Sequence, residues 1–471
     1  MKSLHYNHDD AFSALNRAPA EKHVAEGDDS GDRSKFKDSG IYEVVTGASM
    51  ALGNYLMFSL GLMFLARYVI DQKQFGVYSA SVAAITVAAT AATLGMEKYL
   101  LKIVPSYRAT RRINLVRGYR FFAPMVVTVV TLLVAAALYG LYRLSPPDSG
   151  LASPTFLFAI CCLPAVVFVC YLLEVVTADG AFVVSTAFYR LVLPGLFVGG
   201  VFLLEYRYGQ REVSATEAVV MWGLCWLVVL VMLYLYSRRV RPRNEQAGER
   251  AFRRLDWLRH SSAFLTYSLL MSLITNIGVL VLGLIPSARQ DTAIYAAAAQ
   301  LAGLIVVVST ATNRWYGPKL AACIALNDEA SGQLFLRSRQ IMMWVLVLGF
   351  MLFLWYGGEW ALGLFGPKYT AGWTALVIMG FGASFNCLHS LAPMYLQYIG
   401  REWVVPFLLG GAVLLLIATS VPLGIFYGTV GVASAYTGTL VVSYLVFMVL
   451  ARRTRRAMLT EQGASGLRTW L

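Results

Sequence analysis

Long apolar runs dominate this chain and restrict it to one class of fold. About twelve runs of roughly twenty apolar residues follow one another along 471 residues, and a helix of that length crosses the roughly 30 Å hydrocarbon core of a bilayer. Hydrophobic residues make up 58% of the chain and charged residues 14%. Because only helices and closed barrels satisfy their backbone polar groups in lipid, the sequence predicts an all-α integral membrane protein with about twelve transmembrane helices.

The apolar runs place the spans to within about four residues at each end. We expect them near residues 44–65, 77–94, 121–142, 154–176, 182–204 and 218–236, and then near 264–285, 292–312, 341–356, 373–395, 404–426 and 431–451.

The longest interior polar segment divides these spans into two sets of six. We therefore expect an N-lobe at 41–237, an inter-lobe linker at 238–260 and a C-lobe at 261–451. A basic tail follows at 452–471. The N-terminal tail at 1–40 is polar and lacks hydrophobic periodicity, which predicts disorder, and no apolar stretch in it resembles a signal peptide.

Lysines and arginines gather in alternate loops and predict the orientation. One set of loops carries many cations, as at Lys98–Arg120 and Arg238–Arg259, whereas the opposite loops carry few. The positive-inside rule then places the first set and both termini in the cytoplasm. Apolar and basic residues interleave in Lys98–Arg120, so this segment is also a candidate interfacial helix that binds anionic lipid.

Charge and cysteine usage argue against other classes of function. The net charge of +13 is explained by the loops between spans, so we expect no nucleic-acid partner. The six cysteines lie in or beside apolar runs without metal-ligand spacing, and buried thiols of this kind behave as small hydrophobes. No nucleotide-binding glycine motif is present. We expect no catalytic residue, no metal and no bound cofactor.

The two sets of spans resemble each other weakly. Each has an asparagine in its first span, at Asn54 and Asn276, and a tyrosine that opens an alanine-rich span, at Tyr78 and Tyr295. Parallel repeats of this kind place a substrate site between two bundles.

Four short motifs resemble those of a known family. They are Phe75-Gly76-Val77-Tyr78-Ser79, Tyr295-Ala296-Ala297-Ala298-Ala299-Gln300, Leu364-Phe365-Gly366-Pro367-Lys368-Tyr369 and Tyr427-Gly428-Thr429-Val430-Gly431-Val432-Ala433. In this order they are similar to bacterial polysaccharide exporters, which are lipid-linked oligosaccharide flippases of the multidrug/oligosaccharidyl-lipid/polysaccharide (MOP) superfamily. The resemblance covers about Ile41 to Ala451.

The resemblance implies a MATE-like arrangement of two six-helix lobes around a central cavity. It also implies a flippase that moves undecaprenyl-pyrophosphate-linked sugar repeat units across the bacterial inner membrane by alternating access. The implied partners are this glycan lipid, the membrane lipids, and a polysaccharide polymerase or glycosyltransferases, with the flippase itself a monomer. The resemblance leaves open whether transport is coupled to protons or to sodium ions.

Arg190 is the one cation deep in a predicted span. A charge there costs about 2.5–3.5 kcal/mol on insertion scales, so we expect a partner or a function. One interpretation has Arg190 facing the cavity and attracting pyrophosphate. The other is a structural pair with Glu174 or Asp179, or a position near the inner interface.

Other polar residues in or near the spans complete the candidate site. Asn54, Asn276, Gln300, Asn386 and His389 either line the cavity or join helices by hydrogen bonds. His389 has no partner at metal-ligand spacing. Arg67 and Arg314 lie near span ends, where they either snorkel or add to a cationic cavity. Glu174 is the candidate ion-coupling carboxylate.

Two rival functions remain. The first is a drug or metabolite antiporter of the same superfamily, which the lack of an acid in the middle of the first three spans disfavours. The second is a polyprenyl-dependent membrane glycosyltransferase or polymerase, which the short outer loops disfavour.

Overall fold

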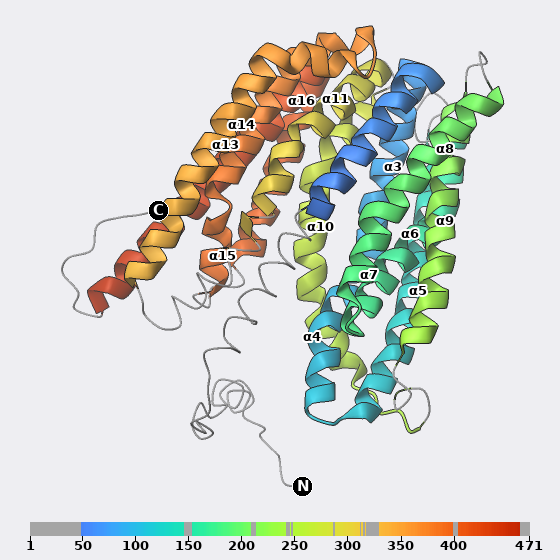
Figure 1. The fold of residues 1–471 in the computed structure, drawn as a ribbon, viewed down its shortest axis with the longest axis vertical. Coiled ribbons are helices and arrows are strands. Elements are labelled where there is room, and N and C mark those ends of the chain that lie inside the picture. Colours follow the sequence, from blue (N-terminus) through green and yellow to red (C-terminus); the bar gives the residue numbers. More distant parts are fainter. Residues whose placement is uncertain are drawn as a thin grey trace, which may run out of the picture. The chain divides into compact units, whose positions relative to one another are not determined.

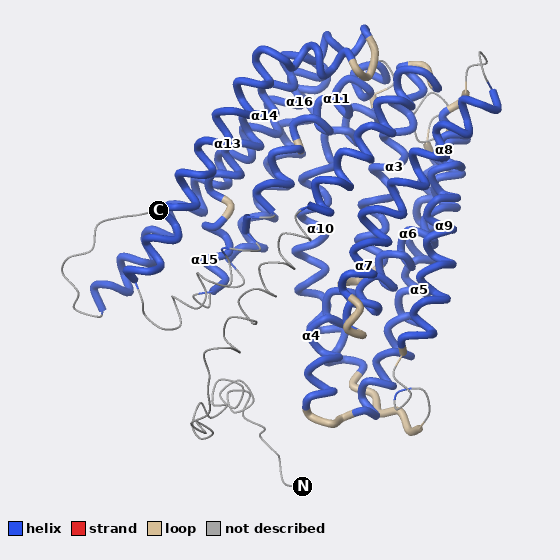
Figure 2. Tube along the Cα trace, in the orientation of Figure 1, coloured by secondary structure: helices blue, strands red, loops and turns tan. Residues whose placement is uncertain are grey.

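The computed structural model is built from helices (Figures 1 and 2). It describes residues 49–145, 153–208, 213–241, 245, 248–285, 288–310, 312–313, 316, 329–398 and 404–461, and none of these lies in a strand. The expected tail at 1–40 lies outside the described residues. Of the expected tail at 452–471, the part up to residue 461 continues the last helix.

The described helices follow in chain order after a first helix that spans Ser49–Val69 and ends in the π-helical turn η1 (Leu65–Val69). The others are α3 (Gln72–Ala92), α4 (Met96–Ala109), α5 (Ile113–Leu144), α6 (Pro154–Ala178), α7 (Phe182–Ala187), η3 (Phe188–Val192), α8 (Leu193–Tyr208), α9 (Ala215–Val240), α10 (Arg254–Leu284), α11 (Arg289–Ala302), α13 (Glu329–Gly363), η6 (Pro367–Gly372), α14 (Trp373–His389), α15 (Leu391–Tyr398) and α16 (Val404–Glu461).

Eleven of the described helical segments are long and apolar enough to cross a membrane, and the last contains two crossings. That segment, Val404–Thr454, has 51 residues, or about 75 Å of helix at 1.5 Å per residue. Gly428 interrupts it with φ 54° and ψ −132°. Val405 and Ala451 from its two parts lie in one buried cluster, so the chain turns back on itself. The prediction of about twelve spans agrees with this layout.

One predicted span is too short, because a helix continues past the apolar residues that reveal it. The ninth was expected at 341–356, whereas the candidate span in α13 is Gly332–Gly363. The second span was expected to end at Leu94, which is close to the end of α3 at Ala92, and α4 follows after a break at residues 93–95. The expected interfacial helix at Lys98–Arg120 is divided between α4 and α5, and its contact with lipid stays a prediction.

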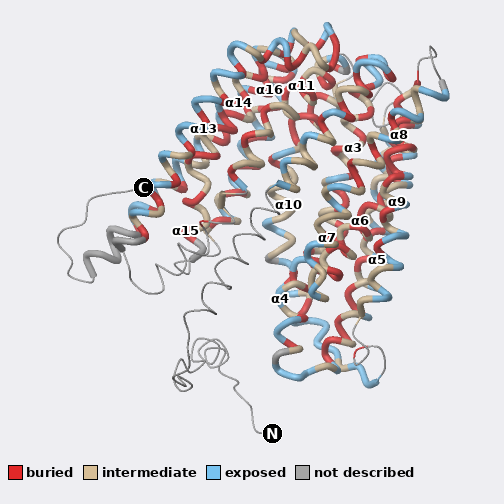
Figure 3. The backbone as a smooth tube through the Cα atoms, viewed as in Figure 1, coloured by how far each residue is buried: buried red, intermediate tan, exposed pale blue. Residues whose placement is uncertain are grey.

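The spans pack around buried side chains, while large apolar residues remain exposed on the outside (Figure 3). In the first half, residues 49–240, α6 packs most extensively against α9. In the second half, residues 254–461, α16 packs against α10 and α14. The halves meet where α3 contacts α10 and α11 and where α4 contacts α10.

Because the spans alternate in direction, their connections gather at two ends. The arginine-rich end holds the connections at 110–112 and 179–181 and the described residues 241, 245 and 248–253. The opposite end holds the connections at 70–71 and 364–366 together with the turn at Gly428.

Candidate functional site

Arg190 lies in a π-helical turn inside a candidate membrane span. The turn is η3, within the span Phe182–Arg207, and the Arg190 side chain is half-buried. It is eight residues from the start of this span at the arginine-rich end, or about 12 Å along a helix. π-Helical turns inside α-helices are frequent at functional positions. The two carboxylates considered as its partners bind other cations, since Glu174 pairs with Lys98 and Asp179 with two other arginines.

Arg67 lies in the other π-helical turn of the first half, η1, at the opposite end. Its Nη1 donates a hydrogen bond of 3.2 Å to the backbone oxygen of Gly363, and its guanidinium lies 5.4 Å from the centre of the Tyr68 ring. Arg67 is exposed and joins the two halves of the chain.

The predicted amide and imidazole residues bind to neighbours outside the predicted set. Gln300 donates from Nε2 to Ser59 Oγ at 2.8 Å, and its backbone oxygen accepts from the Tyr55 hydroxyl, which joins α11 to the first helix. Asn276 donates to the backbone oxygen of Ser272 at 2.9 Å within its own helix. These contacts are of the kind that joins or stabilises helices.

His389 and the remaining candidates complete the set. The Nδ1 atom of His389 lies 3.0 Å from the backbone oxygen of Phe385, four residues earlier in α14. Asn54 and Asn386 are half-buried. Arg314 lies outside the described residues. Glu174, the candidate coupling carboxylate, forms an ion pair with Lys98 and is 18% exposed.

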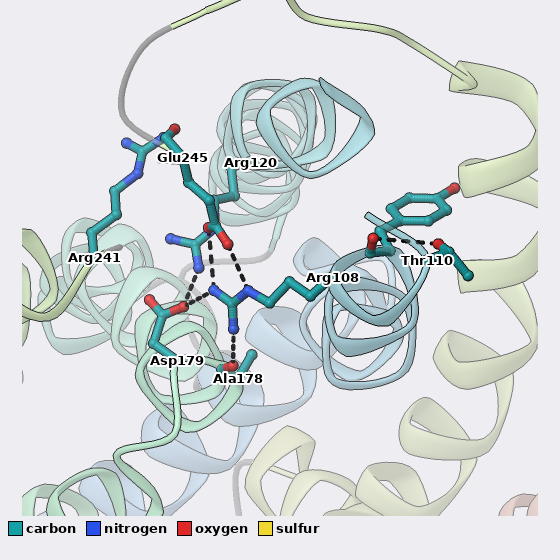
Figure 4. A network of polar contacts seen from close by, with 8 residues as sticks. Arg108, Thr110, Arg120, Ala178, Asp179, Arg241 and Glu245 are labelled. Atoms are coloured by element: carbon teal, nitrogen blue, oxygen red, sulfur yellow. Dashed lines mark hydrogen bonds and ion pairs between the residues drawn. The ribbon is translucent and has the colours of Figure 1, made fainter. Parts of the chain in front are cut away.

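Sequence reasoning missed a cluster of four charged residues at the arginine-rich end (Figure 4). Arg108 in α4 lies 2.6 Å from both Asp179 and Glu245, and also donates to the Ala178 backbone oxygen at 2.6 Å. Arg120 in α5 pairs with the same two carboxylates. Each acidic side chain is 1% exposed. Buried charges are tolerated in a fold when they are paired, and each of these four charges has an opposite charge beside it.

Glu245 belongs to the segment between the two halves, so this cluster attaches that segment to the first half. Arg241 adds a hydrogen bond of 2.9 Å to the Glu245 backbone oxygen. Burial and the nearby charge of Arg120 lower the pKa of the Arg241 guanidinium from its ordinary value. The sequence shows charged residues in these loops but does not show which of them pair. Asp179 and Glu245 are 71 and 137 positions from Arg108 in the chain.

A second missed residue is the buried acid Glu97 in α4. It is 5% exposed, and its Oε2 has no hydrogen-bond partner within the described residues. The expectation was that the middle of the second span holds no acid. Glu97 lies beyond that middle, in the first turn of α4 after the break that follows α3.

Arg339 in α13 is a further missed cation, and it is 1% exposed. Its Nη2 donates to Asn313 Oδ1 at 2.8 Å, to Ser390 Oγ at 2.7 Å and to the Cys387 backbone oxygen at 3.3 Å. No carboxylate pairs with it in the part of the chain that the structure describes. Arg190 is therefore not the one cation deep in a span. The helix α13 begins well before the apolar run that predicted the ninth span, so Arg339 lies inside that span.

Arg339 lies beside the interruption between α14 and α15 at Ser390. The Cys387 oxygen that it binds is near the C-terminal end of α14, where the helix dipole attracts positive charge. This contact gives the buried guanidinium a negative neighbour without an acid.

Comparisons with known proteins place the chain in a family and a fold. The sequence model of a family described as "Polysaccharide biosynthesis protein" matches residues 44–316. A search of curated protein sequences gives no match.

Three solved structures with similar folds are transporters. One is an inward-facing multidrug resistance MATE family transporter of the MOP superfamily, at 12% identity and a TM-score of 0.63, covering 89% of this chain and all of the other. The second is the MATE multidrug transporter DinF-BH, at 12% identity and 0.61, covering 92% and 99%. The third is the lipid II flippase MurJ in an inward closed conformation, at 11% identity and 0.54, covering 86% and 87%. The chain has the two-lobe helical fold of this superfamily.

Proposed function

Because this multi-pass membrane chain belongs to the polysaccharide biosynthesis protein family and has the MOP transporter fold, we propose that it is a flippase for undecaprenyl-pyrophosphate-linked oligosaccharide repeat units. In this proposal it serves exopolysaccharide, capsule or O-antigen synthesis and transports its substrate without catalysing a reaction. The family match carries the proposal. The lipid II flippase, whose substrate is also a lipid, has the same fold.

The proposed orientation follows from charge. We place the arginine-rich end in the cytoplasm of a bacterium, with both termini there, and the chain in the inner membrane. The substrate then enters from the arginine-rich end and leaves at the opposite end. A polysaccharide polymerase and glycosyltransferases remain proposed partners of a monomeric flippase.

The contacts between the two halves support an alternating-access cycle. At the opposite end they include the Arg67 hydrogen bond to Gly363 and the contacts of the Phe75 ring with Phe365 and Tyr369, 6.5 and 6.0 Å between centres. This hydrogen bond and these aromatic contacts separate at a lower cost in free energy than buried ion pairs do. The buried ion-pair cluster instead lies within the first half and its attached segment.

Arg190 is the residue that we propose for the pyrophosphate group. A guanidinium matches phosphate oxygens in geometry and charge, and stays charged in a partly buried site. We keep Asn54, Asn276, Gln300, Asn386, His389, Arg67 and Arg314 as proposed contacts of the sugar and phosphate groups.

An antiporter of drugs or metabolites is the second candidate, and Glu97 is the observation that favours it. A buried acid in the first half is the kind of group on which ion exchange depends. Two of the similar structures are multidrug transporters. The family match favours the flippase.

A deletion strain distinguishes the two functions. If the protein is a flippase, lipid-linked repeat units accumulate in the cytoplasmic leaflet and surface polysaccharide falls, and the wild-type gene restores both. Normal polysaccharide with increased sensitivity to toxic cations would contradict the flippase and favour the antiporter.

A further inference from the structure

Glu97 lies where the second membrane-spanning helix is interrupted. Leu94 and Gly95 have φ of 50° and 67° and separate α3 from α4, which begins one residue before Glu97. Interrupted helices often form ion sites in transporters, because their broken ends present backbone groups with partial charge. The carboxylate is buried there, with one oxygen lacking a hydrogen-bond partner among the described residues.

Two opposed influences act on this carboxylate. Burial removes water from it, which disfavours a charged carboxyl group. Glu97 also lies in the first turn of α4, whose N-terminal N–H groups attract negative charge, and Thr93 and Lys98 interact with it. These influences oppose each other, and each depends on the surroundings of the carboxylate.

The groups around Glu97 leave one negative charge unbalanced. Those that interact with it electrostatically are Lys98 from its own helix, Tyr119 from α5, and Cys170, Tyr171 and Glu174 from α6. From α10, His260 stacks on Tyr99 one turn away. Lys98 is already paired with Glu174. One cation thus faces two carboxylates, and a proton on Glu97 would make this group neutral.

The same interruption touches the second half of the chain. A Cβ atom built on Gly95 would lie 2.5 Å from both the Ser261 backbone oxygen and the Leu265 backbone nitrogen, so the two backbones are in direct contact. Tyr99, one turn after the interruption, packs on His260 and Phe264 of α10, 5.9 and 6.2 Å between ring centres. A change at Glu97 therefore acts next to the contact between the halves.

We propose that Glu97 binds and releases one proton in each transport cycle and that this proton controls the contact between α4 and α10. The inference rests on the proposed function, because it assigns the driving ion of that transport. The proton is taken up from one side of the membrane onto a carboxylate oxygen and released to the other side, and only the O–H bond forms and breaks. A metal cation would need several oxygen ligands, and the described residues contain no group of three or more His, Cys, Asp or Glu that could hold one.

The first experiment measures proton binding without any substrate. Infrared difference spectra of the purified protein in lipid, between alkaline and acidic pH, detect the C=O stretch of a protonated carboxyl group. We expect one such band to be lost in Glu97→Gln, shifted in Glu97→Asp and kept in Glu205→Gln, which changes a half-buried acid in α8. A full band in a folded Glu97→Gln, or its loss in Glu174→Gln instead, would overturn the inference.

The second experiment measures transport in vesicles with an imposed pH or sodium gradient. We expect a pH gradient to accelerate flipping of lipid-linked oligosaccharide by the wild type and Glu205→Gln, and to have at least about tenfold less effect on Glu97→Gln, equal to about 1.4 kcal/mol. Dependence on sodium alone would overturn the inference and leave the flippase standing. No flipping by a wild type that keeps the infrared band would overturn the flippase and leave the proton site standing.

Discussion

The guanidinium of Arg67 donates a hydrogen bond to the backbone oxygen of Gly363, 296 positions later in the chain. This bond joins the end of the first helix to the end of α13 across the two halves. It lies at the end through which the substrate leaves in the proposed cycle. It therefore has to break each time that end opens.

Arg67→Ala should shift the protein toward conformations in which the opposite end is open. The bond is exposed, so we expect it to contribute about 1 kcal/mol or less, a shift of up to about fivefold in the populations. Distances between spin labels at Lys73→Cys and Lys368→Cys, with the native cysteines replaced, would report the change. Arg143→Ala, an exposed arginine at the same end, should leave the distances as they are; unchanged distances in Arg67→Ala would refute the assignment.

Arg190→Gln should reduce polysaccharide export without lowering the amount of protein in the membrane. A charged hydrogen bond to phosphate contributes about 1.5–3 kcal/mol, so we expect a decrease of about ten- to a hundredfold. Export is measured in a complemented deletion strain, and protein by immunoblot. Arg207→Gln, at the far end of the same span, serves as control, and equal export by the two variants would exclude a role for Arg190 in binding.

Glu245→Gln should destabilise the folded protein by about 3–5 kcal/mol, because it leaves Arg108 and Arg120 with one buried carboxylate between them. Thermal unfolding of the purified protein measures the loss. Glu249→Gln changes an exposed acid of the same segment and should have almost no effect. If both variants unfold like the wild type, the cluster contributes little to stability.

Gly95→Ala should destabilise the contact between α4 and α10. The left-handed φ of Gly95 costs an alanine about 1–2 kcal/mol, and its methyl group would also collide with backbone atoms of Ser261 and Leu265. Gly53→Ala is the matched change, since no atom lies within 4 Å of a Cβ at that position. Unfolding temperatures of the two variants test this, and a Gly95→Ala protein as stable as Gly53→Ala would contradict it.

The sequence was sufficient to predict the fold, because the features that define a spanning helix are local. Apolar length gave the number of spans, and loop charge gave an expected orientation. Apolar residues do not mark the end of a span where its helix continues into polar sequence. The start of α13 at Glu329 was missed for this reason, whereas α4 lies in the segment that was expected as an interfacial helix.

The candidate site was harder to predict, because it depends on contacts between distant residues. Glu97 and Arg339 lie outside the expected spans 77–94 and 341–356, so the sequence does not predict their burial. Glu245 looked like any loop acid, and only the folded chain places it between Arg108 and Arg120. The polar residues that sequence reasoning selected were visible because they interrupt apolar runs.

The segment that connects the two halves has a consequence for how they move. Its Glu245 is held by the charged cluster, its Ala251 N–H donates to the Asn114 backbone oxygen at 3.0 Å, and Trp257, fully buried, donates to the Tyr107 hydroxyl at 3.1 Å. Because the connecting segment is held at these points, it is not a flexible linker between the halves. If the halves rock against each other, the pivot falls beyond Trp257, inside α10, and lengthening the connection ahead of it would give the halves no additional freedom.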